Sequence, residues 1–282
     1  MNLLKDNFSN LQSMGWAAVV WAFVATFGLG LNGPAWAQSA PKGIDYLEAL
    51  AEPGALADNM AYIAPSQISE HYSHAVYVNA SARGENMQRM WVISRSGLGS
   101  DSWRLAMVDR DYWSEQDERP HYSWPVSTGR RYADSRSGPT PLGVFNIDDR
   151  DNRHRPGWGS PGMYNSMFLD LHYSSGRASG VAFHGTTRGR YSMLGNIDSH
   201  GCVRMTQENA DDFFALLHPR GVDGESSPLW GEVPRYFSST PRGNQYARSG
   251  YWRDGDLREN SNGEILTKPG YRMLVIIFRD DI

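Results

Sequence analysis

Short runs of apolar residues, separated by polar or glycine-rich stretches, dominate the chain between residues 72 and 184. The runs are rich in β-branched and aromatic side chains, a pattern that predicts strands. The predicted strands span residues 75–78, 87–94, 103–108, 122–127, 143–147, 166–172 and 180–184. Short strands at short intervals along the chain indicate a β-rich domain.

Helical periodicity is confined to two places. Apolar residues recur at helical spacing over 210–217, with Thr206 as the expected N-cap and Gly221 as the expected stop. A shorter helical stretch covers 44–51 and ends before Pro53. The sequence therefore predicts one main helix, which follows the predicted strands.

Residues 222–270 differ in composition from the rest of the chain, being rich in Gly, Ser, Pro, Arg, Asn and aromatic residues without a clear period. A loop of this length is typical of a functional lid or of a partly disordered segment. Its aromatic rings could line a groove for a sugar strand or pack on their own domain. The apolar run 271–278 then predicts a buried closing strand, so we interpret 222–270 as an insertion within one domain, 72–282.

The N-terminal segment 1–37 has the layout of a secretory signal. Lys5 precedes the apolar run 16–31, and Ala35-Trp36-Ala37 forms a small-x-small cleavage site. The run is shorter than the roughly 20 residues of a membrane span, although an uncleaved anchor stays open as an alternative. We expect export to the periplasm or cell envelope, with 38–71 as a leader that packs on the domain.

Charge and cysteine content restrict the function. The formal net charge of -4 on 282 residues gives no reason to expect nucleic acid or an anionic membrane as the partner. Cys202 is the only cysteine, so it cannot form an internal disulfide. An unpaired cysteine in an exported protein indicates either a reactive thiol or a buried small hydrophobe. The residues that flank Cys202 in the sequence favour the reactive thiol.

Two histidines lie close to Cys202 in the sequence. A free thiol has a pKa near 8.5, and an imidazole beside it lowers that pKa and activates the sulfur. His184 ends a predicted strand and so approaches from a separate element, whereas His200 lies only two positions before the thiol. We therefore expect His184 to be the base. Gly201 allows a tight turn whose amide groups can stabilise an oxyanion.

The same residues resemble the L,D-transpeptidase (YkuD-type) catalytic domain. The resemblance rests on His184, a gap of fourteen residues, and then Ser-His-Gly-Cys at 199–202. The segments 125–129 (PVSTG) and 140–145 (TPLGVF) are also similar to the family, as is Arg204-Met205 before the main helix. The resemblance covers residues 72–220 and the last strand. The Arg-rich stretch 130–138 and the insertion depart from the common domain.

The resemblance implies a mainly β, sandwich- or barrel-like fold and a role for each matching residue. Cys202 would be the nucleophile, His184 the base, the Gly185 carbonyl the group that orients the imidazole, and His200 a supporting residue. The amides of His200, Gly201 and Cys202 are the expected oxyanion donors. The expected substrate contacts are Arg204, Ser199 and Thr186, with Arg188 and Arg190 as further candidates for binding stem carboxylates.

The activity implied by the resemblance is acyl transfer on peptidoglycan stem tetrapeptides. The thiol would displace the terminal D-Ala and form a thioester, which an acceptor then resolves. A second stem would give a 3→3 cross-link, water a tripeptide, and a protein lysine an anchored envelope protein. No cofactor or metal is expected, and the sequence carries no signal for an oligomeric state.

Two other classes of protein fit part of the pattern. His184, His200 and Cys202 could form a His₂Cys zinc site, although the sequence offers no obvious fourth ligand. A wall-binding protein with an inactive site is the other alternative, although no required residue is missing.

Overall fold

The computed structural model of the chain describes residues 43–110, 121–130, 138–150, 154–157, 162–173, 175–219, 224–234, 238–242, 245–249 and 259–281. The expected signal segment and the expected helix stop at Gly221 lie outside these residues. The described elements are mostly strands, which confirms the mainly β fold class. No sheet closes on itself in these ranges, so the arrangement is a sandwich and not a barrel.

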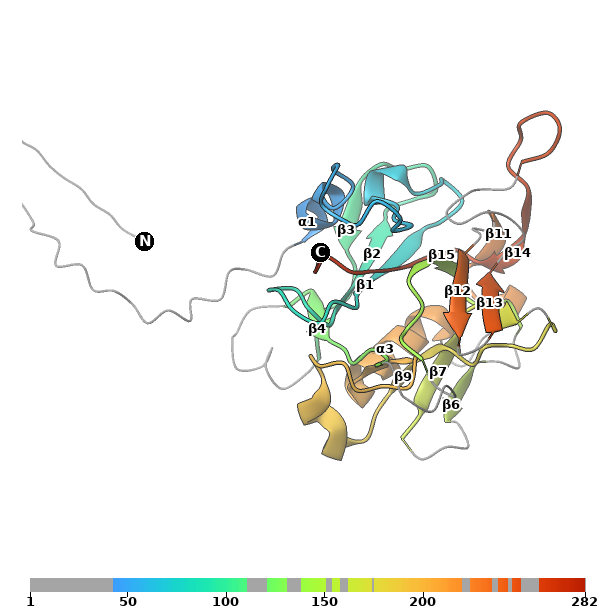
Figure 1. Cartoon of the computed structure of the whole chain (residues 1–282). Coiled ribbons are helices and arrows are strands. Elements are labelled where there is room, and N and C mark those ends of the chain that lie inside the picture. Colours follow the sequence, from blue (N-terminus) through green and yellow to red (C-terminus); the bar gives the residue numbers. More distant parts are fainter. Residues whose placement is uncertain are drawn as a thin grey trace, which may run out of the picture. The chain divides into compact units, whose positions relative to one another are not determined.

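The larger sheet has six strands, in the spatial order β3-β2-β1-β15-β5, with β4 also paired to β2 (Figure 1). Its strands are β1 (His74–Asn79), β2 (Arg89–Arg95), β3 (Trp103–Leu105), β4 (Ser123–Pro125), β5 (Gly143–Asn146) and β15 (Met273–Phe278). All six correspond to predicted strands. β15 pairs in parallel with β1 and antiparallel with β5, so the last strand of the chain lies inside the sheet.

The smaller sheet has the order β10-β9-β7-β6. It contains β6 (Arg155–Gly157), β7 (Tyr164–Phe168), β9 (Ala182–Gly185) and β10 (Val203–Met205). The sequence predicted β7 and β9 with shifted ends and did not predict β6 and β10. Each of these two strands has three residues, too few for a periodic pattern to be recognised.

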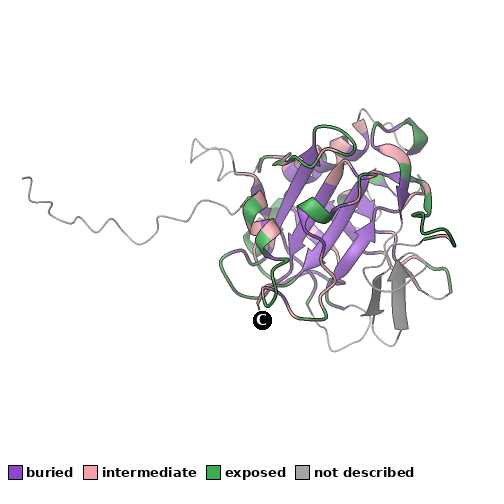
Figure 2. Ribbon diagram, turned by 90° about the horizontal axis from the view of Figure 1, so that it is seen from above, coloured by how far each residue is buried: buried purple, intermediate pink, exposed green. Residues whose placement is uncertain are grey.

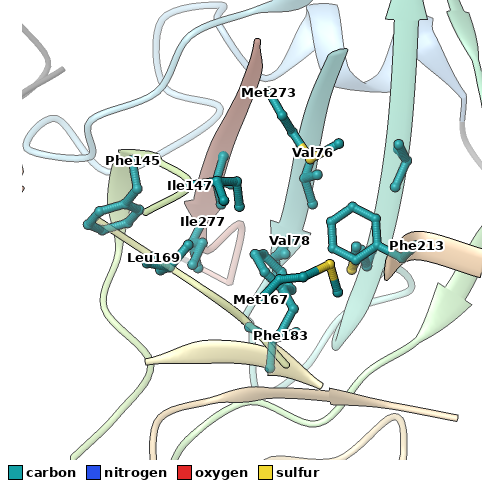
Figure 3. Packing of buried hydrophobic residues seen from close by; sticks show 14 of the residues in the cluster. Val76, Val78, Phe145, Ile147, Met167, Leu169, Phe183, Phe213, Met273 and Ile277 are labelled. Atoms are coloured by element: carbon teal, nitrogen blue, oxygen red, sulfur yellow. The ribbon is translucent and has the colours of Figure 1, made fainter. Parts of the chain in front are cut away.

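The main helix, α3 (Gln207–Leu217), contacts β7 and β9 of the smaller sheet. The Thr206 hydroxyl accepts a hydrogen bond from the Asn209 amide at 3.2 Å, so the predicted N-cap is confirmed. Phe213 of α3 meets Phe183 of β9 edge to face, with ring centroids 5.4 Å apart. Figure 3 shows Phe213 among the residues that fill the space between the two sheets.

Two hydrophobic clusters cover the two faces of the larger sheet. The inner cluster lies between the larger sheet, the smaller sheet and α3 and includes Val76, Phe183 and Phe213 (Figure 3). The outer cluster lies on the opposite face. Along β15 the residues alternate between the clusters, because successive side chains of a strand point to opposite faces. Except for the short β3, the strands of the larger sheet are accordingly buried over most of their length (Figure 2).

The segment 43–72 covers the outer face of the larger sheet. It contains α1 (Ile44–Ala49), in agreement with the predicted helix over 44–51, and the short 3₁₀ helix η1 (Pro65–Gln67). Leu47 and Ile68 are buried in the outer cluster. The Tyr77 hydroxyl donates to the Ile63 carbonyl at 2.7 Å, which ties the segment to β1.

Part of the segment 222–270 is folded into strands, so the expectation of a long loop is wrong for that part. β11 (Trp230–Pro234) pairs antiparallel with β14 (Thr267–Tyr271). β12 (Ser238–Arg242) and β13 (Gln245–Ser249) form a hairpin that adds to β8 (His172–Tyr173). Within the described part of the chain, no helix is long and apolar enough to be a membrane span.

Candidate active site

The candidate site is built on two adjacent parallel strands, β9 and β10. Their register pairs Val203 with Phe183 and Arg204 with His184. Phe183 and Val203 belong to the inner cluster, so the residues that alternate with them face the other way. Cys202 comes directly before β10 and is in phase with Arg204. The register therefore places the imidazole and the guanidinium on the same face of these strands, directly after the turn that carries Cys202.

His184 is buried, with 4% of its surface exposed, and its ring is held by the backbone. Nδ1 lies 2.9 Å from the Gly185 carbonyl oxygen, which assigns the proton to Nδ1 and makes Nε2 the acceptor. Burial lowers the pKa of His184 to about 4. The Gly185 and Gly162 backbones raise that pKa and the charge of Arg204 lowers it, but burial is the largest effect.

This pKa defines the resting state of the site. An imidazole with a pKa near 4 is neutral at pH 7 and carries no positive charge. The ring is instead suited to accept a proton while the sulfur attacks.

Cys202 is partly exposed and forms no disulfide. Its Sγ lies 3.5 Å from the Gly180 carbonyl oxygen, at the entry to β9. Partial exposure distinguishes this side chain from a buried structural cysteine and gives a substrate access to the sulfur.

The turn that carries Cys202 is held against the segment 126–130 by backbone and side-chain bonds. The Ser199 amide donates to the Thr128 carbonyl at 2.9 Å, and the Arg130 amide donates to the Ser199 carbonyl at 3.1 Å. The Ser127 hydroxyl donates to the Asn196 carbonyl at 2.7 Å and accepts from the Asp198 amide at 3.1 Å. These bonds fix both sides of the turn.

Gly201 and Gly129 make a close backbone contact within this turn. Gly201 has a φ of 122°, a conformation that favours glycine. A Cβ on Gly129 would lie 2.6 Å from both Cα and N of Gly201. A side chain at position 129 would therefore push the turn away from its support.

Two of the residues expected to contact the substrate are buried and make hydrogen bonds within the protein. Ser199 has no exposed surface; its hydroxyl donates to the Cys202 carbonyl and accepts from the Gly201 amide at 3.0 Å. Thr186 is 5% exposed, and its amide extends the strand pairing to Met205 at 2.9 Å. Ser199 thus shapes the turn instead of facing a substrate, and its bond to the Gly201 amide already uses one of the three expected oxyanion donors.

The arginine candidates differ in their surroundings. Arg204 Nη1 lies 3.1 Å from the Asp198 carbonyl oxygen and 3.4 Å from Asp198 Oδ2, with 19% of its side chain exposed. Arg190 reaches the same carboxylate at 3.3 Å but is mostly exposed. Arg188 pairs with Glu208 at 2.9 Å and is more exposed still. Arg204 is therefore the arginine that lies beside His184, and Asp198 holds it in place.

Gly185 and His200 complete the set of predicted site residues. A Cβ on Gly185 would lie 3.1 Å from Ala210 Cβ and 3.1 Å from Gln207 Cα, so the start of α3 packs directly against this glycine. This contact keeps the carbonyl that orients His184 in a rigid place. His200 is exposed on the surface of the turn.

A metal cluster does not mark this site in the described part of the chain. No group of three or more His, Cys, Asp or Glu side chains suited to a metal is found in the ranges that the structure describes. A cavity of about 250 Å³ exists elsewhere, and none of the predicted site residues lines it. It is lined by Glu70, His71, Leu98, Gly99, Glu232 and Arg272. The chemistry of the side chains, and not the size of a cavity, locates the candidate site.

Two supporting residues were missed in the sequence. Thr140 is 3% exposed and its hydroxyl lies between Gly129 and Gly201. Gln88 is 1% exposed and accepts from the Thr128 amide at 2.8 Å. Thr140 opens the TPLGVF segment, so that motif was a signal; Gln88 belongs to no motif that could have revealed it.

A protein-family model matches the central part of the chain. Residues 105–225 match YkuD, the L,D-transpeptidase catalytic domain. No curated protein sequence matches the chain.

Solved structures give only remote likenesses. An L,D-transpeptidase (Yku) from Stackebrandtia nassauensis is 15% identical, with a TM-score of 0.31 over 61% of this chain and 58% of that chain. An L,D-transpeptidase from Mycobacterium smegmatis is 16% identical, with a TM-score of 0.27 over 51% and 54%. L,D-transpeptidase 3 from Mycobacterium tuberculosis is 16% identical, with a TM-score of 0.30 over 51% and 56%. The chain thus covers less than two thirds of the length of these proteins.

Proposed function

We propose, from the match of residues 105–225 to the YkuD L,D-transpeptidase catalytic domain, that the protein is a cysteine-dependent transpeptidase of peptidoglycan stem tetrapeptides. The observation that supports it most is the register of β9 and β10, which sets His184 beside Arg204, two positions after Cys202 in the chain. The proposal places the protein in the cell envelope, where its substrate occurs.

The first half of the proposed reaction forms a thioester. Cys202 Sγ attacks the carbonyl between the L-centre of the diamino acid and the terminal D-Ala, while His184 Nε2 takes the thiol proton. The carbonyl oxygen becomes negative and is stabilised by amides of the turn. The carbon–nitrogen bond then breaks, and D-Ala leaves with the proton that His184 returns.

The second half resolves the thioester. An acceptor amine attacks the same carbonyl, His184 accepts its proton, and the sulfur leaves and is reprotonated. An amine of another stem gives a 3→3 cross-link and an amine of a protein lysine gives an anchored protein. Water in place of the amine would give L,D-carboxypeptidase activity at the same site. The guanidinium of Arg204 is proposed to bind a carboxylate of the donor stem.

The test is incubation of the mature protein with tetrapeptide-bearing wall fragments, followed by mass spectrometry of protein and products. We expect D-Ala release, a transient adduct on Cys202 equal to the stem without D-Ala, and a product that identifies the acceptor. Cys202→Ala should remove the adduct and the turnover. Release of D-Ala by Cys202→Ala at the original rate would refute the proposal.

A matched pair of histidine variants tests the base. His184→Gln should lower turnover by a factor of about 10² or more, the range typical for a general base. His200→Gln, on the exposed side of the turn, should retain most of the rate. The opposite pattern would transfer the role of base to His200.

A further inference from the structure

We propose that Thr140 is a positioning residue that sets the direction of the Cys202 amide, so that this N–H serves as the oxyanion donor. This inference rests on the proposed function and extends it to a residue from a different part of the chain. Thr140 lies 61 positions before Gly201 and touches neither the thiol nor the imidazole in any bond found here. It acts through the backbone of the turn.

The hydroxyl of Thr140 makes two bonds whose directions are fixed. Its Oγ1 accepts from the Gly129 amide at 2.7 Å. The same Oγ1 lies 3.0 Å from the Gly201 carbonyl oxygen, which can only accept, so the hydroxyl proton is donated to Gly201. Thr140 is 3% exposed, so water does not readily replace either partner.

The bond to the Gly201 carbonyl determines where the next amide points. Gly201 C=O and Cys202 N–H belong to one planar trans peptide and point in opposite directions. A carbonyl anchored on Thr140 therefore directs the Cys202 N–H away from Thr140. Ser199 fixes the neighbouring groups, because its hydroxyl accepts from the Gly201 amide and donates to the Cys202 carbonyl.

The turn needs this anchor because Gly201 is a glycine. At a φ of 122° it occupies a region that few other residues adopt, and glycine populates several alternatives at little cost. Rotation of the peptide between Gly201 and Cys202 would turn the N–H away from a developing oxyanion. The Thr140 hydroxyl opposes that rotation, and the close contact of Gly201 with Gly129 leaves it little room.

The experiment compares two reactions of the same sulfur. Acylation by a tetrapeptide stem passes through an oxyanion, whereas alkylation by iodoacetamide does not. Thr140→Val keeps the shape of the side chain and removes the hydroxyl. We expect its acylation rate to fall by about 10²-fold, the effect of losing one oxyanion donor. We expect its alkylation rate to stay within about twofold of wild type, because the thiol and His184 are untouched. Thr140→Ser should restore acylation.

A matched control removes an equivalent hydroxyl elsewhere. The Ser227 hydroxyl is also buried, donates to the Leu217 carbonyl at 2.6 Å and accepts from the Leu229 amide at 3.2 Å. Ser227→Ala should lower thermal stability and leave both rates unchanged. If Thr140→Val does not fold, Thr140→Ala compared with Thr140→Ser carries the same test.

Three results would overturn the inference, and they are distinguishable. Acylation of Thr140→Val at the wild-type rate would show that the hydroxyl has no part in catalysis. A parallel fall of acylation and alkylation would show a general displacement of the turn. Absence of acylation in the wild-type protein would remove the proposed function itself, and the role of Thr140 with it.

Discussion

The imidazole of His184 is an acceptor in the resting protein. Its burial, together with the charge of Arg204, lowers its pKa to about 4. A neutral ring with Nδ1–H bound to the Gly185 carbonyl leaves Nε2 for the proton of the thiol.

The first prediction concerns the acid limb of the pH–rate profile. A base whose pKa is lowered loses activity only when pH falls through that lowered value, because above it the ring remains neutral. We therefore expect kcat/KM for a tetrapeptide to fall as pH drops through about 4, and not through the ordinary histidine value near 6.5. The measurement is kcat/KM from about pH 3 to pH 8, with circular dichroism at each pH as the control for folding.

A variant of Arg204 tests one cause of the lowered pKa of His184. Arg204→Gln removes the cation that lowers the pKa of His184, so its acid limb should move to higher pH. The size of the shift is limited because burial, which is unchanged, is the larger cause. A wild-type acid limb near pH 6.5 would contradict the burial of the base.

Single residues differ in how far the sequence could predict them. Cys202 and His184 were identified because their chemistry is rare and their spacing fits a known family. The structural roles of the supporting hydroxyl groups could not be predicted from rare chemistry or from spacing. Ser127, Thr140 and Ser199 act through contacts with backbone groups, and two of them bridge segments more than 60 residues apart. Threonine and serine are also common turn residues, so their type alone does not reveal such bonds.

At the scale of elements, the strands of the larger sheet and the helix α3 were predictable, since each carries a clear apolar pattern. β10 was not predicted, although its central residue, Arg204, pairs with His184. It has three residues and lies between a turn and a helix cap, so no period could develop. β11 and β14 were missed because pairing between distant segments, and not local alternation, defines them.

The second prediction concerns the cap of α3. The Thr206 hydroxyl satisfies the Asn209 amide, and Thr206 has no exposed surface, so water cannot replace the bond. Thr206→Ala should lower the free energy of unfolding by about 1 kcal/mol, within a usual range of roughly 0.5–2. Urea denaturation measures it. Thr206→Ser keeps the cap, so its free energy of unfolding should fall clearly less. An equal fall in both variants would attribute the effect to packing of the threonine methyl group.

At the scale of the described domain, β15 joins two hydrophobic cores. Met273, Val275 and Ile277 belong to the inner cluster, and Leu274, Ile276 and Phe278 to the outer cluster. The strand pairs with β1 on one side and β5 on the other. The described part of the leader, 43–71, is therefore connected to the smaller sheet and α3 through a strand from the far end of the sequence. The composition of 271–278 predicted its burial, but not which strands would be its neighbours.

The third prediction uses two adjacent residues to ask whether these cores unfold together. Ile276 and Ile277 are both fully buried but point into different clusters. Each change to alanine should lower the free energy of unfolding by about 2–5 kcal/mol. Ile265→Ala, at a position that is 38% exposed, is the control and should cost less than about 0.5 kcal/mol.

The shape of the unfolding curves decides between two arrangements. If β15 couples the cores, Ile276→Ala and Ile277→Ala shift one common transition, and fluorescence and circular dichroism report the same midpoint. If the leader and the outer core form a separate unit, Ile276→Ala produces an early transition that leaves thiol alkylation at Cys202 unchanged. We expect the common transition, because β15 supplies alternate residues to both cores and cannot lose one set of contacts without exposing the other.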